Sequence, residues 1–343
     1  MRAGLILGGG GLVGMGYHAG ALKALEEAGL HPGSADVIVG TSAGAVMGAY
    51  LRVGWTPTDF YDYGMGRHPR SPSDPDGQRA EVRDVFTPLW STRGERARRW
   101  MGSMFAVAAA RGYWRAGGSG RLPHPRLRRL FPSGMYSTER TRQRLREDLP
   151  GEWPRDDLFL CVADLYSGRR VAFGTPEAPT ATLPDAVMAS TAIPGVFPPV
   201  RIGPRYYVDG GVLSATSLDL AVDAGCKTAL CIAPLGFRED GPPMIRDPAM
   251  WGPVAVRTLF ARALRREVRA ARERSVEVLV IRPWLTELKA HGTNSMRHFD
   301  RVAVIDAARE GTRRLLEEHA DHPAITALTT RKEPERWPRH STA

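Results

Sequence analysis

The stretch Asp36-Val-Ile-Val-Gly-Thr-Ser-Ala-Gly-Ala45 decides how the rest of the chain is interpreted. Its apolar, β-branched first half suits a buried strand, and its end opens into a helix-like run that reaches Arg52. Between them, Gly40 and Gly44 flank Ser42 in a G-x-S-x-G pentapeptide. Because glycine has no Cβ atom, the chain can turn tightly there and present the serine hydroxyl beside a helix N-terminus. The stretch therefore predicts a strand, a tight turn with a nucleophilic serine, and a helix, although so short a pattern also arises by chance in a chain with 37 glycines.

A glycine-rich loop lies upstream of this turn. Residues 4–7 suit a first short strand, and Gly8-Gly-Gly-Gly-Leu-Val-Gly14 follows them directly. A helix that ends at Gly29 and the strand before Ser42 then complete a right-handed βαβ unit. The uncovered N–H groups of the loop can point at the serine hydroxyl and form an oxyanion hole, in which one donor contributes on the order of 10²–10³ in rate.

The same loop also fits a dinucleotide fingerprint, because Gly9, Gly11 and Gly14 give the pattern G-x-G-x-x-G. That fingerprint requires an acid at the C-terminal end of the next strand, where it would bind a ribose. Here that end is Gly40-Thr-Ser42, and the nearby acid, Asp36, lies at the opposite end of the strand. We therefore favour the oxyanion hole over a nucleotide site.

Composition and length bound the remaining possibilities. A chain of 343 residues with 43% hydrophobic content can bury a sizeable core. The N-terminal apolar run is too short for a signal peptide or a membrane span, so we expect no cleaved leader. Cys161, Cys226 and Cys231 are isolated and lack metal-ligand spacing, which indicates neither a disulfide framework nor a metal site. We expect a cytoplasmic protein.

The net charge of +10 is concentrated in one basic insertion at about residues 93–146. This insertion holds fourteen Arg and two acids, which gives 14 − 2 = +12 and leaves about −2 for the rest of the chain. Its apolar residues have helical spacing, and a further basic cluster follows them. The residues concerned are Trp100, Met101, Met104, Phe105 and Ala108, then Tyr113, Trp114, Arg126, Arg128 and Arg129.

Such a helix suits docking onto an anionic lipid surface. The alternative is an ordinary cap helix with solvated arginines, and amphipathicity alone favours this alternative because most surface helices show it. We expect no nucleic acid partner, since no recognised binding module accompanies the charge.

A second candidate catalytic group stands at the end of a hairpin. Residues 200–202 and 205–208 suit two strands joined by a Gly-Pro turn, and Asp209-Gly210-Gly211 follows them. An acid at a strand end is well placed for chemistry, although Asp-Gly-Gly is also common in turns that have no catalytic role.

The remaining segments alternate between strands and helices. We expect strands at 157–165, 170–173, 229–233 and 276–282, helices at 183–190, 256–275 and 297–318, and a loop or lid at 56–82. The fold class is therefore α/β, a three-layer α/β/α sandwich with a mostly parallel central sheet and a basic helical cap. We expect a single domain over residues 1–328 and a flexible tail at 329–343.

Taken together, the loop Gly8–Gly14, the pentapeptide Gly40–Gly44, the segment Ser190-Thr-Ala-Ile-Pro-Gly-Val-Phe-Pro-Pro199 and Asp209-Gly-Gly211 resemble the patatin-like phospholipase family in order and spacing. The resemblance implies a serine lipid acyl hydrolase with a Ser-Asp dyad and no metal or cofactor. It assigns Ser42 as nucleophile and Asp209 as general base. The implied oxyanion hole is formed by the backbone of Gly10, Gly11 and Leu12, and the implied motif glycines are Gly9, Gly14, Gly40, Gly44, Gly210 and Gly211.

The resemblance implies a phospholipid or other acyl-ester lipid as substrate. The basic insertion adds the expectation of peripheral contact with the inner membrane surface. One departure is Val13, where the family usually has Arg or Lys. His18 also matches a family position, and we interpret it as structural. Two alternatives stay open: a Ser-Asp-His triad that recruits His291 or His298, and a lipid-binding protein that has lost turnover.

Overall fold

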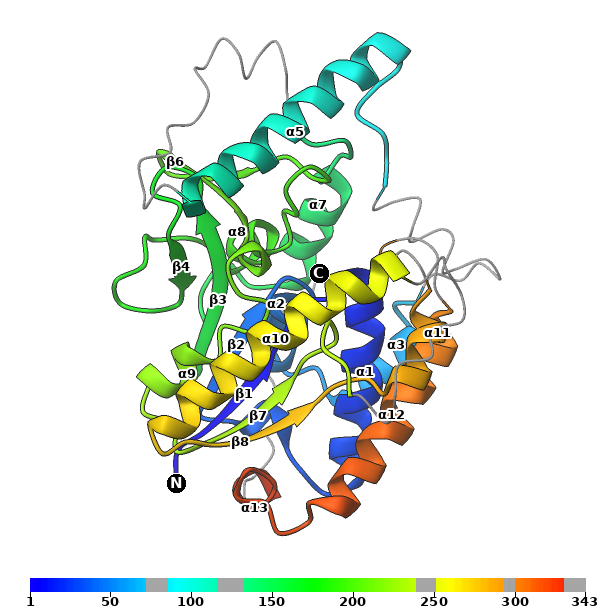
Figure 1. The fold of residues 1–343 in the computed structure, drawn as a ribbon, viewed down its shortest axis with the longest axis vertical. Coiled ribbons are helices and arrows are strands. Elements are labelled where there is room, and N and C mark those ends of the chain that lie inside the picture. The colour runs from blue at the N-terminus through cyan, green and yellow to red at the C-terminus, as the bar shows by residue number, and fades with distance from the viewer. Residues whose placement is uncertain (72–85, 116–132, 239–250, 293–295, 297–299, 330–343) are drawn as a thin grey trace, which may run out of the picture. The chain divides into compact units, whose positions relative to one another are not determined.

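The computed structural model describes residues 1–71, 86–115, 133–238, 251–292, 296 and 300–329 (Figure 1). The chain separates into two compact units. The first consists of Met1–Ser73, Pro154–Phe159 and Ser214–Ala343, and the second of Asp74–Trp153 and Leu160–Leu213. The single domain expected over residues 1–328 stays a prediction.

The first unit contains parallel strands in the order β2, β1, β7, β8 (Figure 1). Leu5 at the centre of β1 pairs with Ile38 of β2 on one side and with Leu230 of β7 on the other. Nearly all residues of these strands are buried, which explains why their sequences are continuous apolar runs rather than alternating ones. Their bounds are Val37–Thr41, Ala3–Leu7, Thr228–Ile232 and Glu277–Ile281.

Helices cover both faces of this parallel sheet. Helix α2 packs on β1 and β2, and α10 packs on β8, while Figure 1 shows α10 in front of the strands and α2 behind them. Helices α1, α3 and α12 pack against one another, and α9 and α13 contact the strands. The bounds are Gly11–Glu27 (α1), Ala43–Arg52 (α2), Pro57–Gly64 (α3), Asp219–Asp223 (α9), Trp251–Glu273 (α10), Leu288–His291 (α11), Arg301–Glu318 (α12) and Pro323–Thr329 (α13).

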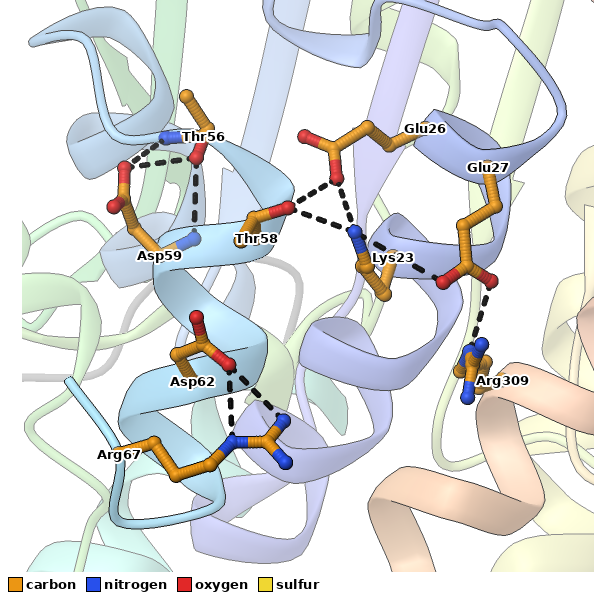
Figure 2. Close-up of polar contacts among 9 residues, drawn as sticks. All are labelled: Lys23, Glu26, Glu27, Thr56, Thr58, Asp59, Asp62, Arg67 and Arg309. Carbon is orange, nitrogen blue, oxygen red and sulfur yellow. Dashed lines mark hydrogen bonds and ion pairs between the residues drawn. The ribbon is translucent and has the colours of Figure 1, made fainter.

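Polar contacts at the surface join α1 to both of its helical neighbours (Figure 2). Lys23 donates to Glu26 at 2.7 Å and to the hydroxyl of Thr58 on α3 at 2.8 Å. On the other side, Arg309 of α12 donates to Glu27 at 2.8 Å. Such partly exposed pairs contribute about 1 kcal/mol or less each. Buried apolar residues therefore hold these helices together, and the polar pairs help to align the helices along one another.

Helix α3 corrects the loop predicted at 56–82. Thr56 accepts a hydrogen bond from the Asp59 amide at 3.1 Å, and the Asp59 carboxylate accepts one from the Thr56 amide at 2.7 Å (Figure 2). This is a capping box, and Pro57 occupies the first helical position, where its missing N–H costs nothing. The prediction was wrong for α3 because proline and aspartate were interpreted as loop formers instead of helix-start residues. Residues 72–82 lie outside the described part of the chain.

The second unit contains antiparallel pairs. Strand β3 (Asp157–Asp164), which enters this unit at Leu160, pairs with β4 (Arg170–Phe173) and with β6 (Arg205–Asp209). Strand β6 also pairs with β5 (Val200–Ile202), so both predicted hairpins are confirmed. The helices of this unit are Arg93–Arg115 (α5), Glu139–Asp148 (α7) and Leu183–Ser190 (α8).

The fold is therefore α/β with a mixed, mostly parallel sheet, as the sequence predicted. Helix α7 was not predicted, because its ten residues are almost entirely polar and Leu145 is its one buried residue. Cys161, Cys226 and Cys231 are buried and are not joined in disulfides. Among the described helices, none is both long and apolar enough to cross a membrane. The basic cluster Arg126, Arg128 and Arg129 and the tail from residue 330 lie outside the described residues.

Candidate active site

Ser42 occupies a strained turn between β2 and α2. Its φ is 55° and its ψ is −118°, a sparsely populated positive-φ conformation that costs a non-glycine residue about 1–3 kcal/mol. Serine at a helix N-cap usually accepts a hydrogen bond from the first turn, but the Ser42 side chain makes no such bond. The strained backbone thus holds a hydroxyl that does not cap its own helix, at the positive end of α2.

The turn leaves no room for side chains at its two glycines. A Cβ atom on Gly40 would lie 2.6 Å from the Cα of Ala45. A Cβ atom on Gly44 would overlap the carbonyl oxygen of Leu7, the last residue of β1. The G-x-S-x-G spacing therefore has a packing cause, since α2 starts directly against the end of β1.

The glycine loop lies beside Ser42. A Cβ atom on Gly9 would be 3.4 Å from the Ser42 Cβ, so the absence of a side chain keeps the space next to the hydroxyl open. The chain leaves β1 at Gly8, and α1 begins at Gly11, whose φ of 62° favours glycine. The structure thus brings together the predicted loop and the predicted serine, both within the first unit.

Most amides at the edges of this loop are already hydrogen-bonded. Gly8 donates to the Ile232 carbonyl at 2.9 Å and Gly9 to the Ala215 carbonyl at 2.8 Å. By contrast, the amides of Gly10, Gly11 and Leu12 have no acceptor among the residues that the structure describes. They include the first amides of α1, which lack partners in any helix. Three adjacent donors therefore remain available for an anionic ligand or a developing oxyanion.

His18 supports the loop from inside the fold. Its Nε2 lies 2.7 Å from the Gly8 carbonyl oxygen, and the side chain is fully buried. Burial lowers the pKa of His18 to about 4, against a smaller opposing effect of the hydrogen bond to Gly8. The ring is therefore neutral at pH 7 and its Nε2–H donates to the carbonyl. This agrees with the structural role expected of His18 and makes it a positioning residue for the loop.

The lowered pKa of His18 predicts an acid-sensitive fold. Between pH 6.5 and about 4 the unfolded chain binds a proton at His18 that the folded chain does not, so folding stability falls as pH falls. The full difference is about 3 kcal/mol. We expect His18→Gln to remove this part of the pH dependence, while His319→Gln, a change at an exposed histidine, leaves it intact. Urea unfolding at several pH values measures the free energy of unfolding of each variant. If this free energy changed equally with pH in the parent and in His18→Gln, the prediction would be contradicted.

Asp209 ends β6 in the second unit, where the backbone around it is fixed by hydrogen bonds. Its N–H donates to the Ala192 carbonyl at 3.0 Å, and its Oδ1 accepts from the Gly211 amide at 2.7 Å. The side chain is buried. A Cβ atom on Gly210 would lie 2.6 Å from the Cys161 carbonyl oxygen, so a glycine is needed after the aspartate. The Asp-Gly-Gly sequence therefore holds one carboxylate in a defined orientation. The pairing of this carboxylate with Ser42 stays a prediction.

A buried arginine that the sequence did not single out lies behind the glycine loop. Arg257 of α10 donates to the Pro234 carbonyl at 2.7 Å, and its other Nη lies 2.9 Å from Nδ1 of His291. Pro234 borders the loop, because a Cβ on Gly10 would be 3.0 Å from the Pro234 Cβ. Nothing in the sequence distinguished Arg257 from the other arginines of its helix.

The environment of His291 bears on the triad alternative. Its Nδ1 faces a guanidinium group, whereas a triad histidine has a carboxylate in this position. Burial, followed by the charge of Arg257, lowers the pKa of His291 to about 3. The described geometry therefore gives His291 no general-base environment, and His298 lies outside the described residues.

Val13, the departure from the family pattern, is buried in the core, where a basic side chain would be desolvated.

A strained serine between a strand and a helix, next to a glycine loop, is typical of α/β folds that carry a G-x-S-x-G nucleophile. A family model described as patatin-like phospholipase matches residues 5–222. The chain belongs to the patatin-like phospholipase family, which indicates a lipid acyl hydrolase. No curated protein matches the sequence. The solved structure of VipD from Legionella pneumophila is similar at 16% identity with a TM-score of 0.44, over 93% of this chain and 67% of that one.

Proposed function

We propose that this protein is a serine lipid acyl hydrolase that cleaves carboxylic ester bonds of membrane lipids. The observation that carries the proposal is the position of Ser42 beside three amides, Gly10 to Leu12, that have no acceptor among the described residues. Membership of the patatin-like family supports a phospholipid, lysophospholipid or related ester as substrate.

In the first half-reaction, Asp209 accepts the proton of the Ser42 hydroxyl as its oxygen attacks the ester carbonyl carbon. The carbonyl oxygen becomes an oxyanion, which receives hydrogen bonds from the amides of Gly10, Gly11 and Leu12. Asp209 then gives the proton to the departing alcohol, and the acyl group stays on Ser42. No histidine is needed, which fits the Arg257 contact and low pKa of His291.

In the second half-reaction, Asp209 accepts a proton from a water molecule that attacks the acyl carbonyl carbon. The same amides stabilise the second oxyanion. When it collapses, the bond to the Ser42 oxygen breaks, Asp209 returns the proton to that oxygen, and the fatty acid leaves. One carboxylate thus serves as base and acid in turn, without a metal or an organic cofactor.

A fluorophosphonate probe tests whether Ser42 is a nucleophile. We expect the parent protein to be labelled and Ser42→Ala to lose both labelling and fatty-acid release, the latter by about 10³-fold or more. Ser275→Ala is the matched control, because Ser275 also has a positive φ, 59°, but is exposed beyond α10. A parent protein that is neither labelled nor able to release fatty acid from several lipids would contradict the proposal and favour a non-catalytic lipid-binding protein.

A further inference from the structure

Helix α5 (Arg93–Arg115) carries an exposed apolar stripe in its first half. Trp100, Met101 and Met104 have exposed fractions of 59%, 38% and 46%. With the exposed Ala97 they occupy positions i, i+3, i+4 and i+7, which is one face of a helix. In an ordinary surface helix this face would pack on the core. We call these four residues the α5 stripe.

The opposite side of the helix holds it in place. Gly102 and Ser103 are buried, and Ser103 accepts a hydrogen bond from the Gly134 amide at 3.0 Å. Arg99, which is half-buried, donates to the Gly134 carbonyl at 3.3 Å. Over residues 93–104, small and polar residues thus face the protein, while Trp100, Met101 and Met104 face outward. This orientation is the reverse of the one expected for an ordinary cap helix.

Basic side chains border the α5 stripe. At 100° per residue, Arg96 and Arg98 fall on its two sides, and Arg93 lies on the stripe one turn before Ala97. All three arginines are exposed. The one acid of this segment, Glu95, falls on the far side of the helix, where its carboxylate accepts from the Ser91 amide at 2.8 Å. The exposed face therefore combines apolar and cationic groups.

We propose that the α5 stripe and its arginines dock onto an anionic lipid bilayer, with the helix lying along the interface. Tryptophan and methionine would enter the headgroup boundary while the arginines contact lipid phosphates. A second copy of the chain fits this face poorly, because two such surfaces would bring arginines toward arginines. The inference deepens the proposed function, since it names the surface that would bring the enzyme to its lipid substrate.

Vesicle sedimentation tests the proposal with the full-length chain. The vesicles are phosphatidylcholine with about a third phosphatidylglycerol, compared with pure phosphatidylcholine. We expect binding that requires the anionic lipid and weakens with salt. The triple variant Arg93→Gln, Arg96→Gln, Arg98→Gln should bind about 10²-fold less tightly, on the basis of roughly 1 kcal/mol for each arginine. Trp100→Ser with Met104→Ser should weaken binding at least about tenfold.

A second Arg-rich helix provides the matched control. Arg262, Arg265 and Arg266 are exposed on α10, which also carries exposed Val256 and Leu259. Replacing these three arginines by Gln removes the same charge, and we expect it to change vesicle binding less than threefold. The proposal is overturned if the α10 variant loses binding and the α5 variant keeps it, or if neutral and anionic vesicles bind equally. It is also overturned if α5 changes abolish only self-association or binding to nucleic acid.

Two further readouts separate this proposal from the proposed function. Hydrolysis of a water-soluble short-chain ester should be unchanged by the α5 substitutions, because they leave Ser42 and its loop intact. Vesicle binding should be unchanged by Ser42→Ala. If ester hydrolysis is absent while binding depends on α5, the enzyme proposal fails and the docking surface stands. If ester hydrolysis is present while vesicle binding does not depend on α5, the docking surface fails and the enzyme proposal stands.

Discussion

Asp209→Asn is expected to abolish ester hydrolysis, by about 10³-fold or more in kcat, while the protein stays folded. The amide oxygen of asparagine can still accept the hydrogen bond that Asp209 takes from the Gly211 amide at 2.7 Å. What asparagine cannot do is accept a proton from the Ser42 hydroxyl or from water. The substitution therefore separates the chemical role of the carboxylate from its structural one.

Two further variants, Asp209→Ala and Glu177→Gln, separate the loss of the carboxylate's chemistry from loss of stability and from the change in charge. Asp209→Ala should lose activity equally and also lose about 1–3 kcal/mol of stability, because the Gly211 amide loses its acceptor. Glu177→Gln, at an exposed acid of the same unit, makes the same charge change and should leave kcat within a factor of two. The measurements are hydrolysis of a water-soluble ester and thermal unfolding. Substantial activity in a folded Asp209→Asn protein would rule out Asp209 as the general base.

The strands were predictable because burial left a clear pattern in the sequence. Strands β1, β2 and β7 are buried throughout, so apolar residues follow one another without interruption. The tight turns that follow β2 and β6 could be predicted from their glycines. The structure explains why glycines occur there, because a Cβ atom on Gly44 or Gly210 would meet backbone atoms. The positions of Ser42 and Asp209 at strand ends followed from these two signals.

The orientation of α5 was not predictable from spacing alone. Periodicity locates an apolar stripe on a helix, but it does not say whether that stripe meets the protein or the solvent. Here the small residues Gly102 and Ser103 face the protein, and Trp100 points outward. The sequence contained a hint, because small residues opposite large ones allow close approach of a helix backbone to its support.

The support of the glycine loop was also hidden from the sequence. His18 could be placed on the first helix, but its bond to the Gly8 carbonyl depends on how α1 turns back over β1. Arg257 lies about 250 residues from the loop it backs, and its contacts with the Pro234 carbonyl and with His291 of α11 arise only when α10 packs against both segments. Contacts between residues so distant in sequence depend on packing, which local patterns do not report.

The second large effect is expected at Gly44, where even a methyl group should destroy the elbow. In Gly44→Ala the new Cβ would overlap the Leu7 carbonyl oxygen, a backbone atom that is fixed in the centre of the parallel sheet. Either the start of α2 must move away from β1 or β1 must shift against its neighbours. We expect a loss of about 3 kcal/mol or more in stability, as for severe overpacking, together with loss of probe labelling at Ser42.

Gly16→Ala is the matched control for this change. Its Cβ would meet Val304 Cγ1 at 3.5 Å, an ordinary van der Waals contact, and alanine favours the helical backbone of α1 by up to about 1 kcal/mol. Thermal unfolding and probe labelling should therefore stay near those of the parent. If Gly44→Ala were as stable as Gly16→Ala and still labelled at Ser42, α2 could not begin against the end of β1 as described. The strained serine, the adjoining loop and the proposed oxyanion hole all depend on that close approach of helix to strand.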